Sequence, residues 1–182
     1  AVEIALLRRN TVFSDSSFDE KAREQGIVEG LRVRGVVLDV SRDITIVDIA
    51  GINGELKRSE CEWYTVPNCC DLFKKGKDFE FIVKGIDSNR SIIELSRRFP
   101  NDDPWQQNAL PRAREIVDVT FIAKVGDRYL GRLNGNIDVW IPRYELAWLE
   151  SQMPDEATII GSEQKVLLIE RNDAEKYFVG SI

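Results

Sequence analysis

Short runs of alternating apolar and polar residues mark the chain from residue 30 onward. In DFEFIVKGID, residues 78–87, the apolar side chains of Phe79, Phe81 and Val83 recur at every second position. A period of two is typical of a β-strand with one better-buried face. Comparable runs lie at residues 31–40, 44–50, 54–59 and 91–96. Five strands within about 70 residues predict a small closed β-barrel rather than an α/β sheet.

A second series of β-rich runs follows, at residues 114–125, 128–135, 137–142, 162–171 and 176–182. Three correspondences align it with the first: Asn53-Gly54 with Asn134-Gly135, Lys75-Gly76 with Ile160-Gly161, and Asp87 with Asp173. An Asn-Gly pair is a strong signal for a tight hairpin, because both residues tolerate a positive φ. The offsets of 81, 85 and 86 residues indicate two copies of one fold that differ by small insertions.

Changes in composition divide the chain into four segments. Residues 1–29 combine an apolar start with a stretch near Ser16 that has acidic residues placed for the first turn of a short helix. Three prolines between residues 99 and 113 interrupt any regular element. We therefore expect an N-terminal segment at 1–29, a first repeat at 30–98, a linker at 99–113 and a second repeat at 114–182. The start at Ala1, without a Met, indicates a piece of a longer protein.

The residue types that most enzymes need for acid–base or metal chemistry are scarce. The chain has no histidine, and two of its three cysteines, Cys61, Cys69 and Cys70, are adjacent. These facts exclude a Ser-His or Cys-His arrangement and a Cys-x-x-Cys clip. Asp102 and Asp103 lie in the proline-flanked linker without further acidic residues nearby in sequence to complete a Mg²⁺ site. We therefore expect no catalytic residue, no metal and no cofactor.

The charge of the chain is acidic and unevenly distributed. The net charge is −6, with 16 basic against 17 acidic residues up to residue 98 and 9 against 14 thereafter. This balance argues against strong non-specific binding to nucleic acid, although it permits a local basic patch. No run approaches the roughly 20 apolar residues of a membrane span, and the start lacks the pattern of a signal peptide. We expect a soluble, cytoplasmic protein that contacts no membrane.

The motifs of the two series resemble a known repeat. GLRVRGVVLDVSRDITIVDIAGINGELKRSE, followed by FKKGKDFEFIVKGIDSNRSIIELSRR and DPW, resembles the RNA-binding repeat of the bacterial ribosomal protein S-one family. KVGDRYLGRLNG and WIPRYE resemble another repeat of that family. The resemblance covers about residues 28–182 and implies an all-β fold of two tandem five-stranded OB-fold barrels. Similar repeats occur in polynucleotide phosphorylase, other ribonucleases and transcription factors, so the type of domain is better identified than the parent protein.

The resemblance also implies where RNA binds. In that family the RNA face is formed by strands two and three, with an aromatic ring on strand two and often a His on strand three. These positions correspond to Ile46 and Lys57 in the first repeat and to Tyr129 and Pro142 in the second. Rings beside cations are surfaces on which single-stranded RNA stacks. The implied RNA contacts are Tyr129, Arg128, Arg132, Lys124, Trp140 and Arg143 in the second repeat and Lys57, Arg58 and Lys84 in the first. Core packing of the rings and plain solvation of the cations are the alternatives.

The first repeat has no aromatic ring at Ile46. It is most similar to the opening repeats of the family, which attach to the ribosome through protein contacts. Ile46, together with Trp63 and Tyr64 in the presumed loop after strand three, is therefore a candidate for docking a protein partner. Ordinary packing of loop aromatics is the alternative.

The resemblance implies a non-catalytic, RNA-binding and ribosome-associated module. The second barrel is expected to contact single-stranded messenger RNA, and the first to dock a protein of the small ribosomal subunit. Two alternatives remain open: a protein-binding scaffold without RNA affinity, and an accessory domain of an RNA-processing enzyme. A basic, exposed face around Tyr129 favours RNA binding, whereas burial of Tyr129 favours the scaffold.

Overall fold

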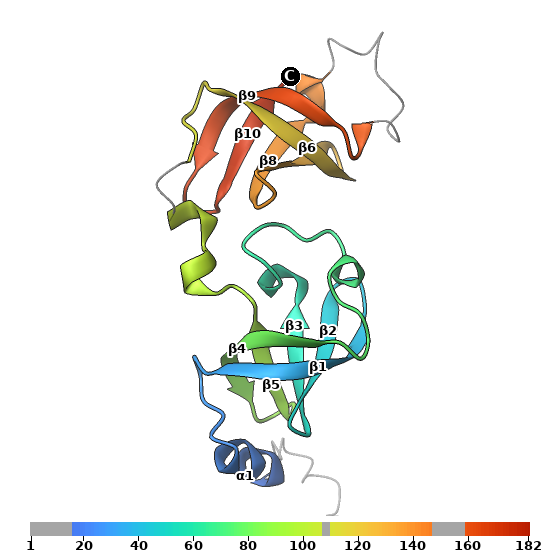
Figure 1. Cartoon of the computed structure of the whole chain (residues 1–182), viewed down its shortest axis with the longest axis vertical. Coiled ribbons are helices and arrows are strands. Elements are labelled where there is room, and N and C mark those ends of the chain that lie inside the picture. Colours follow the sequence, from blue (N-terminus) through green and yellow to red (C-terminus); the bar gives the residue numbers. More distant parts are fainter. Residues whose placement is uncertain (1–15, 107–109, 147–158) are drawn as a thin grey trace, which may run out of the picture. The chain divides into compact units, whose positions relative to one another are not determined.

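The computed structural model describes residues 16–106, 110–146 and 159–182, which form two compact units. The first unit contains the described residues up to Cys61 together with residues 68–99, and the second contains residues 62–67 and the described residues from Pro100 onward. Each unit is built on a closed five-stranded barrel (Figure 1). The predicted all-β fold of two such barrels, with a short helix near the N-terminus, is confirmed.

The first barrel closes in the strand order β1-β2-β3-β5-β4. Its strands are β1 (Arg32–Val40), β2 (Ile44–Ile49), β3 (Ile52–Lys57), β4 (Asp78–Asp87) and β5 (Ile92–Ser96). Neighbouring strands are antiparallel except β3 and β5, which are parallel. The other elements of this unit are helix α1 (Ser16–Glu24) before the barrel and the 3-10 turns η1 (Arg58–Glu60) and η2 (Cys69–Asp71) after β3.

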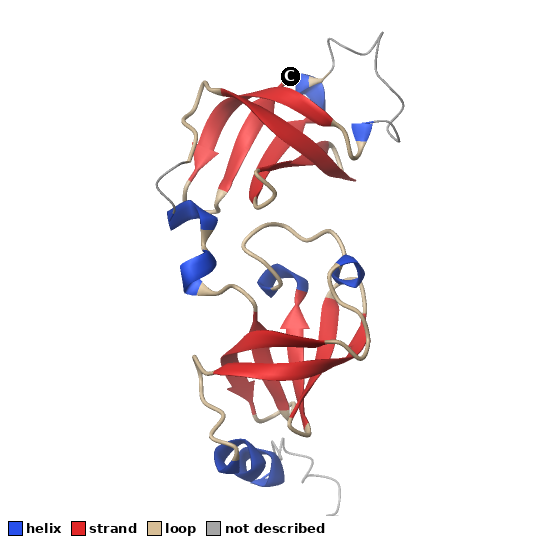
Figure 2. Cartoon of the chain, viewed as in Figure 1, coloured by secondary structure: helices blue, strands red, loops and turns tan. Residues whose placement is uncertain are grey.

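The second barrel repeats this topology in the order β10-β8-β7-β6-β9, with β8 and β10 parallel. Its strands are β6 (Ile116–Val125), β7 (Arg128–Leu133), β8 (Ile137–Pro142), β9 (Glu163–Asn172) and β10 (Tyr177–Ser181). The 3-10 turns η3 (Pro100–Asp102) and η4 (Pro104–Gln106) precede it, and η5 (Arg143–Glu145) follows β8 (Figure 2). No helix in the described part of the chain is long and apolar enough to cross a membrane.

The cores of the barrels follow the alternation in the sequence. Phe81 and Val83 of β4 are fully buried, and the residues beside them are partly or fully exposed. In the second barrel Phe121 and Phe178 are likewise buried, and the ring of Trp105 stacks on Phe178 with centroids 5.2 Å apart. Burial of such rings is the main favourable term that offsets the conformational entropy of the chain.

The first hairpin turns at a different place from the one expected. Ala50 and Gly51 form the two-residue connection between β2 and β3, with φ angles of 50° and 86°. Asn53-Gly54 instead lies inside β3, so the prediction of a hairpin at this pair is wrong. Gly54 serves a different purpose, because an added Cβ would lie 2.6 Å from a side-chain carbon of Leu95 on the parallel strand β5. Its lack of a side chain lets the two strands pack closely.

The strand registers give the true correspondence between the repeats. β1 and β6 each carry a bulge at the same place, and this aligns the pair Val37↔Val47 with the pair Phe121↔Gly131. Ile46 therefore corresponds to Leu130, and Tyr129 lies one residue earlier. Because successive residues of a strand point to opposite faces, this shift of one residue moves Tyr129 from the outer face to the inner face.

Candidate nucleic-acid interface

The three cations predicted to contact RNA in the first barrel are engaged in ion pairs. The N···O distances are 3.3 Å for Lys57–Glu94, 3.2 Å for Arg58–Asp43 and 2.6 Å for Lys84–Glu60. A phosphate must compete with a carboxylate for each of these cations. The pairs therefore weaken the case for RNA at this barrel.

The outer face of β2 and β3 is also acidic. Ile46 is half-buried on this face and pairs with Glu55 across the strands. Glu55 is only 5% exposed, and Arg90 donates to it at 2.5 Å. Such a surface carries an apolar side chain among satisfied charges, which suits contact with protein better than contact with phosphate.

The ring of Tyr129 lies in the core of the second barrel. The residue is 5% exposed, and its ring meets Phe121 edge to face with centroids 5.9 Å apart. The ammonium of Lys124 lies 6.0 Å from the ring centroid. A base needs an open aromatic face for stacking, and Tyr129 has almost none. The burial of Tyr129 therefore favours the protein-binding scaffold without RNA affinity.

Arg132 is buried as well, opposite Asp138 on β8. The two residues are 6% and 5% exposed, and Arg132 Nε lies 3.5 Å from Asp138 Oδ1. Burial lowers the pKa of Arg132 from its ordinary value, while the charge of Asp138 opposes the shift. The pair occupies the outer face of β7–β8, where the strand pattern places Arg128, Leu130 and Arg132 on the same side.

Residues 62–67, which we call the strap, cover the Arg132–Asp138 pair. Asp138 Oδ2 accepts a hydrogen bond from Thr65 N at 2.7 Å, and Arg132 Nη2 donates to Thr65 O at 2.9 Å. The guanidinium of Arg132 lies 3.9 Å from the ring centroid of Tyr64. Lys176 Nζ is 4.1 Å from the ring centroid of Trp63. Both predicted docking aromatics thus contact residues of this same chain.

The exposed end of the β7–β8 face carries the other predicted cations. Lys124, Arg128 and Arg143 are exposed, and backbone contacts hold them together: Arg128 pairs with Pro142, and Arg143 N donates to Asp127 O at 2.9 Å. Within the described ranges, neither Arg128 nor Arg143 forms an ion pair.

Tyr144, which follows Arg143 on η5, is 72% exposed. The sequence reasoning missed it, although WIPRYE contains it directly after Arg143. Trp140 is half-buried and pairs with Leu130 midway along the same face, between this end and the strap. We call the group of Lys124, Arg128, Arg143 and Tyr144 the barrel-end cluster.

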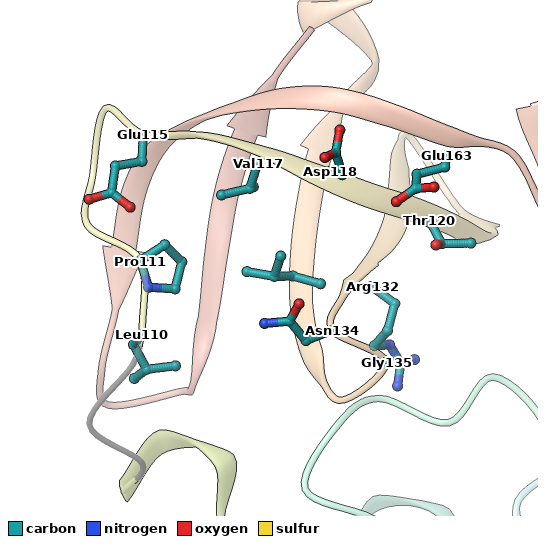
Figure 3. A pocket seen from close by; sticks show the side chains of 11 residues that line it. Leu110, Pro111, Glu115, Val117, Asp118, Thr120, Arg132, Asn134, Gly135 and Glu163 are labelled. Atoms are coloured by element: carbon teal, nitrogen blue, oxygen red, sulfur yellow. The ribbon is translucent and has the colours of Figure 1, made fainter.

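A cavity of about 630 Å³ lies beside the β7–β8 turn of the second barrel. Three carboxylates line one side of it, across from Arg132 and Asn134 (Figure 3). They belong to Glu115 before β6, Asp118 on β6 and Glu163 on β9. A lining with three carboxylates and one arginine disfavours a phosphate here. No group of three or more acidic or cysteine side chains in the described ranges is arranged to hold a metal ion.

Comparison with known proteins supplies relatives but no family model, since none matches the chain. The small ribosomal subunit protein bS1 of Coxiella burnetii is 23% identical over 177 residues, which cover 95% of this chain and 32% of that protein. The bS1 protein of Mycobacterium tuberculosis is 23% identical over 93% of this chain and 37% of its own length. Among solved structures, GSP13 from Bacillus subtilis is 21% identical, with 47% of this chain and 67% of that chain covered and a TM-score of 0.39.

The matches to bS1 extend across both barrels, because they cover nearly all of the chain. The chain in turn spans about a third of the length of these curated relatives. The resemblance that the sequence motifs indicated is confirmed: this chain, with its tandem barrels, is a relative of the small ribosomal subunit protein bS1.

Proposed function

We propose that this chain is a non-catalytic, ribosome-associated module that binds single-stranded RNA through the barrel-end cluster of its second barrel. The observation that carries the proposal is the exposed ring of Tyr144, which follows Arg143 on η5, at the end of β8 where Arg128 pairs with Pro142. Neither arginine forms an ion pair within the described residues. A base stacked on an aromatic ring contributes about 1 to 3 kcal/mol. The cations attract the phosphate on either side of that base.

The first barrel docks a protein partner in this proposal. Its exposed cations are paired with carboxylates, and Ile46 adds apolar surface among them. The names of the relatives support a ribosomal setting. In this proposal the partner is a protein of the small subunit, the nucleic acid is messenger RNA and the location is the cytoplasm.

A protein-binding scaffold without RNA affinity is the second candidate. The burial of Tyr129 and the occupation of the Arg132–Asp138 pair by the strap favour it. These observations remove two of the residues that the resemblance assigns to RNA. They leave the barrel-end cluster untouched.

Fluorescence anisotropy with a labelled single-stranded RNA of about 12 nucleotides, the size of one barrel site, tests the proposal. Loss of the Tyr144 ring should weaken binding about fivefold or more, from about 1 kcal/mol per stacked base. Arg128→Gln should also weaken binding. The matched control Lys57→Gln changes an exposed cation of the first barrel and should leave affinity unchanged. If the wild-type chain shows no binding at low salt, the scaffold replaces the RNA-binding module.

A further inference from the structure

We propose that the strap closes a nucleobase site formed by Arg132 and Asp138, and that this site takes a base with a carbonyl next to an N–H, as guanine and uracil have. The inference rests on the proposed RNA binding and extends it from the barrel-end cluster to the covered end of the β7–β8 face. The strap then competes with RNA for this end.

Arg132 and Asp138 together bind one hydrogen-bond donor and one acceptor. Asp138 accepts the N–H of Thr65 and Arg132 donates to the C=O of the same residue, at 2.7 and 2.9 Å. The two charged side chains thus read one donor and one acceptor that lie close together. Guanine and uracil present the same combination on one rigid edge, where side chains read single-stranded RNA.

The face of the Arg132 guanidinium carries an aromatic ring. Tyr64 places its ring 3.9 Å from the guanidinium carbon of Arg132. Arginine planes are surfaces on which unstacked bases lie in RNA complexes. Tyr64 thus marks the guanidinium face as a surface for an aromatic plane, and in bound RNA the base next to the one that the pair binds would lie there.

The strap leaves part of the hydrogen-bonding capacity of Arg132 and Asp138 unused. Arg132 Nε and Asp138 Oδ1 are buried and take part in no hydrogen bond within the described residues. They face each other at 3.5 Å, which is too long for a well-formed charged hydrogen bond. Buried charged groups of purely structural use are normally satisfied, because unsatisfied ones are costly. Open bonding capacity fits groups that also serve another ligand.

The Arg132–Asp138 site lies on the same strand face as Arg128 of the barrel-end cluster. Arg128 and Arg132 lie on the same face of β7, four residues apart, which is about 13 Å at the rise of a strand. The pair Leu130↔Trp140 lies between them; Leu130 is fully buried, and Trp140 is half-buried, so a strand passing between the two arginines would lie over Trp140. An RNA strand anchored at the cluster and continuing along this face meets the strap at Arg132.

The test opens the strap without touching the barrel. Thr65→Pro removes the N–H that Asp138 accepts, and Tyr64→Ala, as a second and independent opening, removes the ring over Arg132. Thr65→Val is the matched control, because the side chain of Thr65 is exposed and the change keeps both backbone groups. Each full-length variant is titrated with labelled 12-nucleotide oligo-U and oligo-C, since cytosine has no carbonyl beside an N–H.

Thr65→Pro and Tyr64→Ala should bind oligo-U about tenfold more tightly than Thr65→Val, the gain expected when a competitor that fills a site about 90% of the time is released. Oligo-C should gain less. In the wild-type chain, saturating oligo-U should accelerate hydrogen exchange of the Thr65 amide. Equal affinity of Thr65→Pro and Thr65→Val for oligo-U overturns the inference. A second outcome also overturns it. If a synthetic peptide of residues 61–68 binds to Thr65→Pro and oligo-U does not displace it, the face is a peptide site.

The inference and the proposed function fail separately. If the wild-type chain binds oligo-U through Tyr144 and strap opening adds nothing, the inference is wrong and the proposed function stands. If only the opened variants bind, and Tyr144→Ala has no effect in them, the nucleobase site stands and the barrel-end cluster is not the RNA surface. If no variant binds either oligonucleotide at low salt, both are wrong.

Discussion

At the scale of single residues, Tyr129, which the resemblance assigned to RNA contact, is buried, whereas Tyr144, to which the sequence analysis assigned no role, is exposed. Tyr129 is 5% exposed and belongs to the core cluster of the second barrel, whereas Tyr144 is 72% exposed. We expect Tyr129→Ala to lower the free energy of unfolding by about 3 kcal/mol, as for other buried rings. Tyr144→Ala should change it by less than about 0.5 kcal/mol. Urea unfolding followed by circular dichroism measures both, and a loss below about 1 kcal/mol for Tyr129→Ala would show that its ring is not a core element.

Glu60 gives the first barrel an acid-sensitive contact. Burial raises the pKa of its carboxyl, but hydrogen bonds from Lys84 and Ser96 and the charges of Lys84 and Arg98 outweigh burial, so the pKa is lowered from 4.5. The folded state therefore favours the ionised form, and its contribution to stability is full above pH 4.5 and lost as pH falls through the lower folded value.

Glu60→Gln isolates this contribution. The difference in unfolding free energy between the wild-type chain and the variant should be constant from pH 7 to about 5 and should shrink at lower pH. Glu80→Gln removes a half-exposed carboxylate from a 3.7 Å ion pair and should have a smaller effect throughout. A difference that grows as pH falls contradicts the assignment.

At the scale of elements, the turn between β2 and β3 decides which face each residue takes. Ala50 adopts a φ of 50°, a left-handed conformation that is unfavourable for alanine, whereas the corresponding position of the second barrel holds Asn134 with a φ of 52°. We expect Ala50→Asn to stabilise the first barrel by about 0.5 to 1 kcal/mol, because Asn tolerates this conformation. Asn134→Ala should cost about as much. Thermal unfolding of both variants checks the pair, and a loss of stability in Ala50→Asn would contradict the expectation.

The sequence predicted the strands better than it predicted the faces of their residues. Alternation predicts each strand well, because burial of every second side chain constrains it. The alignment of the repeats instead depended on Asn53-Gly54, a turn signal that the structure places within β3. The position of Tyr129 came from the resemblance, and its error of one residue becomes an error of face, since the side-chain period of a strand is two.

The strap had no detectable signal in the sequence. Tyr64 and Arg132 are separated by 68 positions, and nothing in their local sequence indicates that they meet. Trp63 and Tyr64 were predicted to dock a protein partner, and in the structure both rings contact cations of this same chain. Long-range contacts of loops follow from the packed fold rather than from local pattern, so the site could be predicted only in part.

At the scale of the whole molecule, charge limits how RNA can bind. The net charge is −6, and the residues from 99 onward carry 9 basic against 14 acidic residues. This balance argues against a broad phosphate-binding surface, so we expect RNA binding to depend on a few exposed cations.

The salt dependence of RNA affinity tests that conclusion. Three cations, Lys124, Arg128 and Arg143, are exposed in the barrel-end cluster. Neutralisation of about three phosphates of a single strand predicts a slope of about −2 for log affinity against log salt. Anisotropy titrations across a salt series measure this slope, and Arg128→Gln should make it shallower by about 0.7. A slope steeper than about −4 would require more cations than the cluster holds and would place RNA elsewhere on the chain. A slope near zero would mean that stacking on Tyr144 acts without the phosphates, in which case Arg128→Gln would leave the affinity unchanged.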